Sequence, residues 1–224
     1  MIRRAHGTDT TIARDALAEL CRIYWYPLYA YVRRSGCGPH DAEDLTQGFF
    51  ARLLRLDSLA TVSRAEGKFR AFLLASLKHY LADARDYACA QRRDVRLTIS
   101  LDAMQAEERY LAVPADTLTP DQVFERQWAV TLLDTVMQRL AGEYEASGKG
   151  ALFTGLRFAI GGKSDLPYRE LAVQVGLSEE AVRVAVYRLR QRYRVALRKE
   201  LAQTVSSEAE VMEELRDLRR VLSP

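Results

Sequence analysis

Apolar residues recur three and four positions apart along most of the chain, which is the spacing that places them on one face of an α-helix. The first set is Leu17, Leu20, Cys21, Tyr24, Leu28 and Tyr31. This set predicts a helix from about Thr10 to Arg34. We expect a kink or a break at Pro27, because proline has no amide hydrogen to donate within a helix.

Two further helices are predicted in the first half of the chain. One begins near Pro39, a residue suited to a first helical turn, and its apolar stripe is Leu45, Phe49 and Leu53. The other covers residues 69–91, and its apolar positions are Phe72, Leu73, Leu77 and Leu81. The stretch between them, residues 57–68, predicts a loop.

The helical pattern fades over residues 94–121, where Pro114 and Pro120 interrupt it. Acids are enriched in this stretch, and we interpret it as a linker. A second helical block begins near residue 122. Its first apolar positions are Trp128, Leu132, Val136 and Leu140. A short helix is predicted around residues 152–160.

Residues 167–201 carry the most specific local pattern. A short helix is expected to end at Gly176, because glycine adopts the left-handed conformation of a sharp turn without strain. Ser178 can cap the long helix that follows. Ala172, Gly176 and Val182 have the spacing of a helix-turn-helix. The long helix carries Arg183, Arg188, Arg190, Arg192, Arg194, Arg198 and Lys199. The cations alone fit a solvated amphipathic helix equally well, but together with the turn before them they favour binding to nucleic-acid phosphates.

The tail, residues 203–224, predicts one more amphipathic helix. "SEAE", Ser207 to Glu210, has the pattern of a capping box, and the apolar face is Val211, Leu215, Leu218 and Leu222. So short a helix is marginal in water, and we therefore expect its apolar face to be covered. It either packs on the second block or bridges the two blocks and hides a functional surface.

Composition narrows the class of protein. The chain has 224 residues, is 48% hydrophobic and carries a formal charge of +3, which fits a folded protein rather than a disordered tail. Three separated cysteines give no disulfide framework. The chain shows neither a signal peptide nor an apolar run long enough to span a bilayer, so we expect a cytoplasmic protein without a membrane partner.

Catalytic patterns are missing from the sequence. It contains no glycine-rich phosphate loop, and His6, His40 and His79 lack the spacing of metal ligands. We therefore expect no enzyme, no catalytic residue, no metal site and no cofactor.

Two motifs and their order carry a resemblance to a known family. "DAEDLTQGFFARL" and "GKFRAFLLASLKHYLADARD", followed by the linker and the helix-turn-helix pattern, resemble the extracytoplasmic-function (ECF) class of bacterial sigma factors. The resemblance covers residues 10–93 and 122–201. It implies a factor that binds core RNA polymerase and directs promoter-specific transcription initiation.

The resemblance also implies roles for individual residues. The polymerase-binding face would be Asp41, Asp44, Gln47 and Gly48. The downstream promoter element would be contacted by Lys68, Arg70, Lys78, His79, Tyr80, Arg85, Arg92 and Arg93. The upstream element would be contacted by Arg183, Val184, Tyr187, Arg188, Arg190 and Arg192. Two positions depart from the family, which often has an acid at Gly48 and usually has asparagine at His79. Without the resemblance, the acid near residue 41 is better explained by compensation of a helix dipole, and the resemblance reverses that preference.

These inferences combine into an all-α fold of two helical domains joined by a linker. We expect an N-terminal sigma domain at residues 1–93, a linker at 94–121, a helix-turn-helix domain at 122–202 and a helical tail at 203–224. The expected partners are core RNA polymerase, promoter DNA, and a regulator protein or the tail as its own inhibitor. The alternative is a stand-alone helix-turn-helix repressor or activator, which would bind duplex DNA without polymerase.

Overall fold

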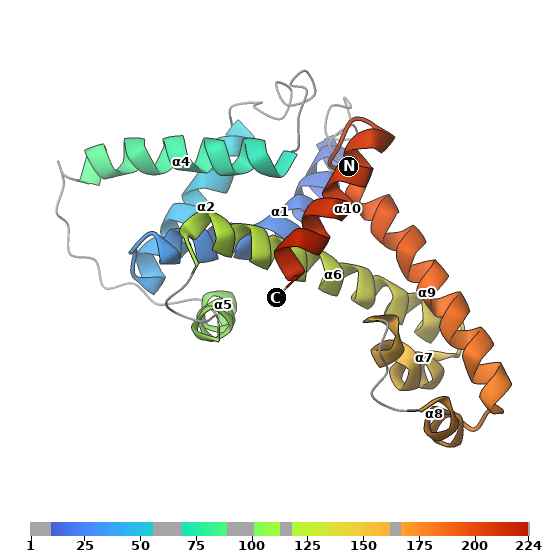
Figure 1. Ribbon diagram of the computed structural model, residues 1–224. Coiled ribbons are helices and arrows are strands. Elements are labelled where there is room, and N and C mark those ends of the chain that lie inside the picture. The colour runs from blue at the N-terminus through green and yellow to red at the C-terminus, as the bar shows by residue number, and fades with distance from the viewer. Residues whose placement is uncertain (1–9, 56–68, 89–100, 113–117, 162–166, 224) are drawn as a thin grey trace. The chain divides into compact units, whose positions relative to one another are not determined.

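The computed structural model describes residues 10–55, 69–88, 101–112, 118–161 and 167–223. Within these ranges the chain is all-α and contains no β-strand, as predicted (Figure 1). The helices are α1 (Thr10–Arg34), α2 (Pro39–Arg55), α4 (Phe69–Ala88), α5 (Leu101–Leu111), α6 (Pro120–Ala146), α7 (Gly150–Leu156), the 3₁₀ helix η1 (Arg157–Gly161), α8 (Tyr168–Val175), α9 (Glu179–Leu201) and α10 (Glu208–Leu222). None of these helices is both long and apolar enough to cross a membrane. The predicted loop at 57–68 lies outside the described residues.

Internal contacts divide the chain into two compact units. Unit 1 comprises Met1–Thr131 and Ala202–Pro224, and unit 2 comprises Leu132–Leu201. The division falls inside α6, not at the start of the second block predicted near residue 122. The tail belongs to unit 1. From the sequence we expected it either to pack on the second block or to bridge the two blocks.

The core of unit 1 is built largely from aromatic and leucine side chains of α1 and α4. Tyr24 and Leu28 are buried on α1, and the ring of Tyr24 meets the edge of Phe69 on α4 at 5.5 Å between centroids. Helix α1 continues through Pro27 without the break that the sequence allowed. The buried residues around the proline outweigh its cost, which is about 3 kcal/mol in a helix interior.

Helix α5 lies in the segment interpreted as a linker and was missed by the apolar pattern. It contacts α1 and α2, and among its described residues only Ala106 is a buried apolar side chain. Polar groups attach it instead: both oxygens of Glu107 accept hydrogen bonds from Arg33, at 2.6 and 2.7 Å, and the Tyr29 hydroxyl donates to the same carboxylate.

Capping residues fix where α6 and α10 begin. Thr119 and Gln122 form a reciprocal capping box at α6, each side chain accepting from the other's backbone amide. At α10 the Ser207 hydroxyl accepts from the amide of Glu210, as predicted. The Glu210 side chain accepts from the amide of Ser206, one residue before the predicted partner.

The core of unit 2 brings α7, η1, α8 and α9 together around the second half of α6. Its buried members are Val136, Leu140, Tyr144, Phe153, Leu156, Ala159, Leu171, Ala172, Val182, Val186 and Leu189. Trp128, Leu132, Val136 and Leu140 are all buried, which confirms the stripe predicted for the start of the second block.

Candidate functional site

The turn between α8 and α9 has the geometry that its sequence predicts. Gly176 has a left-handed backbone with φ of +67°, and its amide reaches the carbonyl groups of Ala172 and Val173 at the end of α8. Two residues later, the Ser178 hydroxyl accepts from the amide of Ala181 and caps α9. A residue with a β-carbon would be strained at position 176. The glycine therefore sets the angle at which α9 leaves the turn.

The first half of α9 exposes a mixed basic and apolar surface. Val184, Tyr187 and Arg188 are exposed, and the Tyr187 side chain is 64% accessible. Arg183 is also exposed and forms an ion pair with Glu179, one turn earlier, at 2.6 Å. With Arg192, further along the helix, five of the six residues assigned to the upstream element lie on its accessible surface.

Arg190 and Arg192, the last two residues assigned to the upstream element, contact residues outside α9 within unit 2. Arg190 is half-buried, and its Nε donates to the carbonyl oxygen of Ala159 at 2.8 Å. The guanidinium of Arg192 lies over the ring of Tyr144, 5.3 Å from its centroid. In this structure Arg190 holds η1 against α9, a structural role that the charge pattern alone did not indicate.

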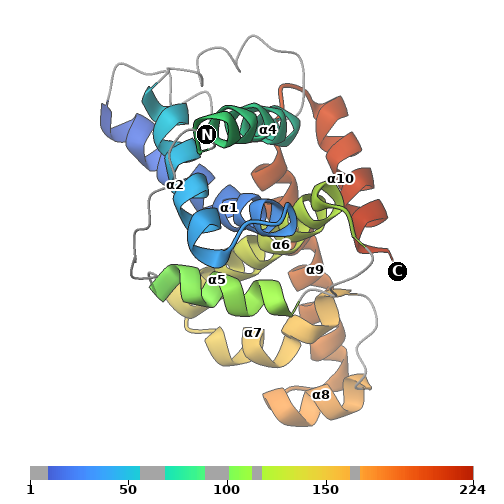
Figure 2. The same cartoon turned by 90° about the vertical axis from the view of Figure 1, so that its left-hand side faces the viewer.

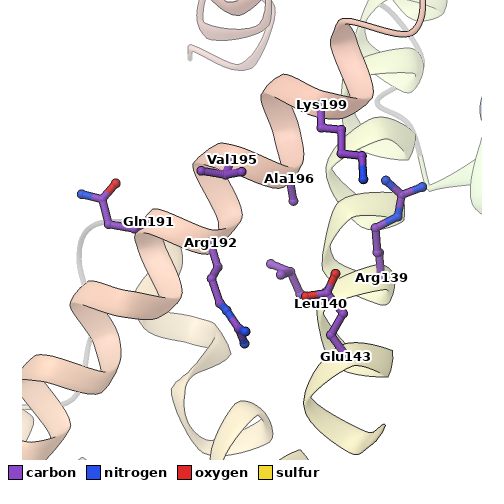
Figure 3. A pocket seen from close by; sticks show the side chains of 8 residues that line it. All are labelled: Arg139, Leu140, Glu143, Gln191, Arg192, Val195, Ala196 and Lys199. Atoms are coloured by element: carbon purple, nitrogen blue, oxygen red, sulfur yellow. The ribbon is translucent and has the colours of Figure 1, made fainter. Parts of the chain in front are cut away.

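A groove of about 380 Å³ runs along α6 and the second half of α9 (Figure 3). It is lined by Arg139, Leu140, Glu143, Gln191, Arg192, Val195, Ala196 and Lys199. Its floor is partly apolar, and its charged lining holds three cations and one acid. Arg139, one of these cations, already forms an ion pair with the buried Glu200 at 2.6 Å.

Helix α2 presents an acidic and polar face. Asp41, Asp44 and Gln47 are exposed, while Phe49 is buried. Glu43, the remaining acid at this end of the helix, is only 4% exposed and accepts a hydrogen bond from the Gln47 amide at 3.0 Å. Two carboxylates therefore face outward, one turn apart.

Gly48 is half-buried and faces α4. A β-carbon at this position would lie 2.4 Å from the hydroxyl oxygen of Tyr80 and 3.5 Å from its Cζ. The Tyr80 ring is held by Phe49, at 5.8 Å between centroids, and by the Arg52 guanidinium above it. Close packing of α2 on α4 thus accounts for the glycine, whereas the sequence suggested only a missing charge.

The residues of α4 that were assigned to the downstream element have different surroundings. Lys78 and His79 are exposed, and Lys78 pairs with Asp121 at 2.5 Å, a hydrogen bond that raises the pKa of the lysine. Tyr80 is half-buried against α2. Lys68, Arg92 and Arg93 lie outside the described residues, and so does the side chain of Arg85.

Arg70 has surroundings that the sequence did not predict. Its side chain is 5% exposed and forms ion pairs with Glu125 of α6 and with two acids of α10, Glu214 at 3.0 Å and Asp217 at 2.6 Å. The guanidinium also lies over the Trp128 ring at 4.3 Å from its centroid. In this structure the arginine joins three helices of unit 1, so the surface assigned to DNA lacks it.

The buried position of Glu214 could have been found from the sequence. The apolar stripe of the tail predicts which face of its helix is covered. Glu214 is three residues after Val211 and four before Leu218, so it shares their face, and all three are buried. Leu222, assigned to the apolar face, is 40% exposed.

The polar contacts around α5 shift the acidity of the groups that make them. Hydrogen bonding from Arg33 lowers the pKa of Glu107, and the same contact raises the pKa of Arg33. Burial raises the pKa of Tyr26 to about 12, and the Arg109 guanidinium lies 3.9 Å from the centroid of that ring. These interactions hold α5 within the fold of unit 1.

Comparison with known proteins gives a named relative. The chain is 26% identical over 201 residues to the ECF RNA polymerase sigma factor SigE of Mycolicibacterium smegmatis, a match that covers 90% of this chain and 69% of that protein. A match of this length is too long to fall within either unit alone. No protein-family model matches the chain, and no solved structure matches it.

Proposed function

We propose that this chain is a sigma factor of the ECF class, which binds core RNA polymerase and directs it to promoters. The observation that carries the proposal is the similarity to a sigma factor over 90% of the chain, which takes in both compact units. A stand-alone DNA-binding protein would be expected to share its DNA-binding unit only.

The exposed face of α2 is the proposed polymerase contact. Asp41 and Asp44 point to solvent, while the neighbouring acid Glu43 turns inward. Dipole compensation alone favours acid at a helix start but does not select an outward face. Two exposed carboxylates one turn apart suit a basic surface on a partner, where charge-assisted hydrogen bonds are strongest.

Helices α8 and α9 are proposed to act as a helix-turn-helix that reads the upstream promoter element as duplex. Arg183 and Arg188 are accessible near the start of α9, where a recognition helix contacts base edges. Arginine can pair with guanine through two hydrogen bonds in the major groove. Tyr187 adds an exposed aromatic surface between the two arginines.

Helix α4 is proposed to contact the melted downstream element. Lys78 and His79 are exposed next to each other on this helix. Cations that follow the backbone together with aromatic rings that stack on bases are the usual means of holding a single strand.

Titration of the full chain against core RNA polymerase tests the proposal. Replacing both Asp41 and Asp44 by alanine should weaken the complex by about 1.5–3 kcal/mol for each carboxylate that binds the polymerase. The matched control removes two exposed acids of unit 1 elsewhere, Asp83→Ala with Glu108→Ala, and should leave affinity nearly unchanged. Thermal unfolding of each variant checks that the fold is retained.

The same titration discriminates the alternative. A stand-alone repressor or activator would not bind core polymerase and would bind its duplex site tightly by itself. If the wild-type chain shows no complex with core polymerase and yields no promoter-specific transcript with it, the sigma-factor proposal is wrong.

A further inference from the structure

We propose that α10 is an internal inhibitor of unit 1, in which Glu214 and Asp217 hold Arg70 in place of the phosphates of a nucleic acid. The inference rests on the proposed function, in which α4 contacts promoter DNA. It adds that Arg70 is withheld from this contact in the conformation described, while Lys78 and His79 stay exposed, and that Arg70 becomes available when α10 is released.

The chemistry of the Arg70 contacts supports exchange with phosphate. A guanidinium presents paired N–H donors that fit the oxygens of a carboxylate or of a phosphate equally well. Glu214 meets Nε of Arg70, and Asp217 meets one terminal nitrogen at 2.6 Å. A nucleic-acid backbone could therefore satisfy the same donors once these two acids leave.

The charge balance of the cluster works against permanent docking. One buried guanidinium faces three carboxylates, those of Glu125, Glu214 and Asp217. Glu214 is 2% exposed, and desolvation of a carboxylate is repaid only where pairing is complete. Glu125 comes from α6, so Arg70 keeps one acidic partner when α10 departs and is not left as an unpaired buried charge.

The fully buried apolar part of α10 is small. Its buried apolar side chains are Val211 and Leu218, and the Phe69 amide donates to the Thr204 carbonyl just before the helix at 3.4 Å. Figure 2 shows α10 beside the end of α4 that carries Arg70. A short helix with two apolar anchors and a shared ion cluster is suited to reversible docking.

The test weakens the docked state without shortening the chain. Glu214→Gln with Asp217→Asn removes both charges and nearly preserves shape. The control, Glu208→Gln with Glu213→Gln, removes the same charge from exposed positions of α10. The probe is a short fluorescein-labelled single-stranded oligonucleotide, followed by anisotropy at several salt concentrations.

Each charge-assisted contact contributes roughly tenfold or more to the docking equilibrium, and the cluster variant weakens two of them, so it should bind the oligonucleotide at least about tenfold tighter than the control. Engagement of one further phosphate by Arg70 should steepen the salt dependence, with the slope of log K against log salt increasing by about 0.7. Equal affinities and equal slopes for the two variants would overturn the inference.

Hydrogen exchange on the wild-type chain decides the matter even if the cluster variant unfolds. Adding the oligonucleotide should speed exchange of the α10 amides, because DNA and α10 compete for Arg70. If the α10 amides exchange at an unchanged rate while the oligonucleotide is bound, the tail only packs against unit 1 and the inference is wrong. The proposed function would still stand as long as the chain binds core polymerase. Loss of both oligonucleotide and polymerase binding in the wild-type chain would remove the inference together with the function on which it rests.

Discussion

Replacing Gly48 by alanine tests whether glycine is required there for packing. In an open helix this change is stabilising by about 1 kcal/mol, because alanine is the better helix former. Here the new methyl group would meet the Tyr80 hydroxyl oxygen at 2.4 Å, well inside van der Waals contact. Overpacking of this kind costs typically about 1–3 kcal/mol. The net result should therefore range from neutral to a loss of about 2 kcal/mol.

A second substitution isolates the clash. Tyr80→Phe removes the offending oxygen and leaves the ring, whose nearest carbon lies 3.5 Å from the position that the alanine methyl would take, an ordinary contact distance. In that background Gly48→Ala should stabilise by about 1 kcal/mol, its full helix propensity. The four proteins form a double-mutant cycle with an expected coupling of about 1–3 kcal/mol.

Urea unfolding followed by circular dichroism measures all four stabilities. The coupling is read from midpoints at constant slope, so that a change in the denatured state is not mistaken for a change in packing. If Gly48→Ala were stabilising by the same amount with tyrosine and with phenylalanine at position 80, the two helices would not be in steric contact through this pair. The packing explanation for the glycine would then be wrong.

Two further predictions follow from contacts within each unit. Arg33 lowers the pKa of Glu107 in the folded state, so the ion pair stabilises the protein above the ordinary carboxyl pKa, and this stabilisation is lost as pH falls through the lowered pKa. Glu107→Gln should therefore reduce the free energy of unfolding by about 1.5–3 kcal/mol at neutral pH. In urea unfolding at several pH values, the difference in stability between the variant and the wild type should shrink below about pH 4.5. Arg188→Ala should weaken promoter binding by about 1–3 kcal/mol with little change in Tm. Arg190→Ala should lower Tm, because it removes the hydrogen bond to the Ala159 carbonyl oxygen. Equal Tm values for the two variants would contradict a DNA-binding role for Arg188 and a structural role for Arg190.

Apolar spacing and turn chemistry predicted most of the fold. The end of α8 at the left-handed Gly176 and the caps at Ser178 and Ser207 depend on neighbours within four residues, which a sequence displays directly. Helix α5 was missed because it lies in the acidic stretch that was interpreted as a linker, and the distant polar partners that hold it cannot be identified from sequence spacing.

The candidate site was only partly accessible to the same reasoning. Exposure of Asp41, Asp44 and Arg188 follows from helical position, and the structure places them on the surface. Arg70 and Arg190 were assigned to DNA because the family resemblance places them on DNA-binding helices and their charge suits phosphate. Their buried partners lie far away in sequence, and only tertiary structure brings these groups together.

The course of the chain through the two units gives α10 a second effect. The chain leaves unit 1 inside α6 and re-enters it at Ala202, so docking of α10 closes a ring that contains all of unit 2. Ring closure limits the arrangements open to the enclosed segment, at an entropic cost that grows only with the logarithm of ring length. If α10 is released as proposed, the ring opens and unit 2 keeps a single covalent connection to the rest of unit 1. Since thermodynamic linkage is reciprocal, any partner that requires that freedom in unit 2 would also favour an uncovered Arg70 in unit 1.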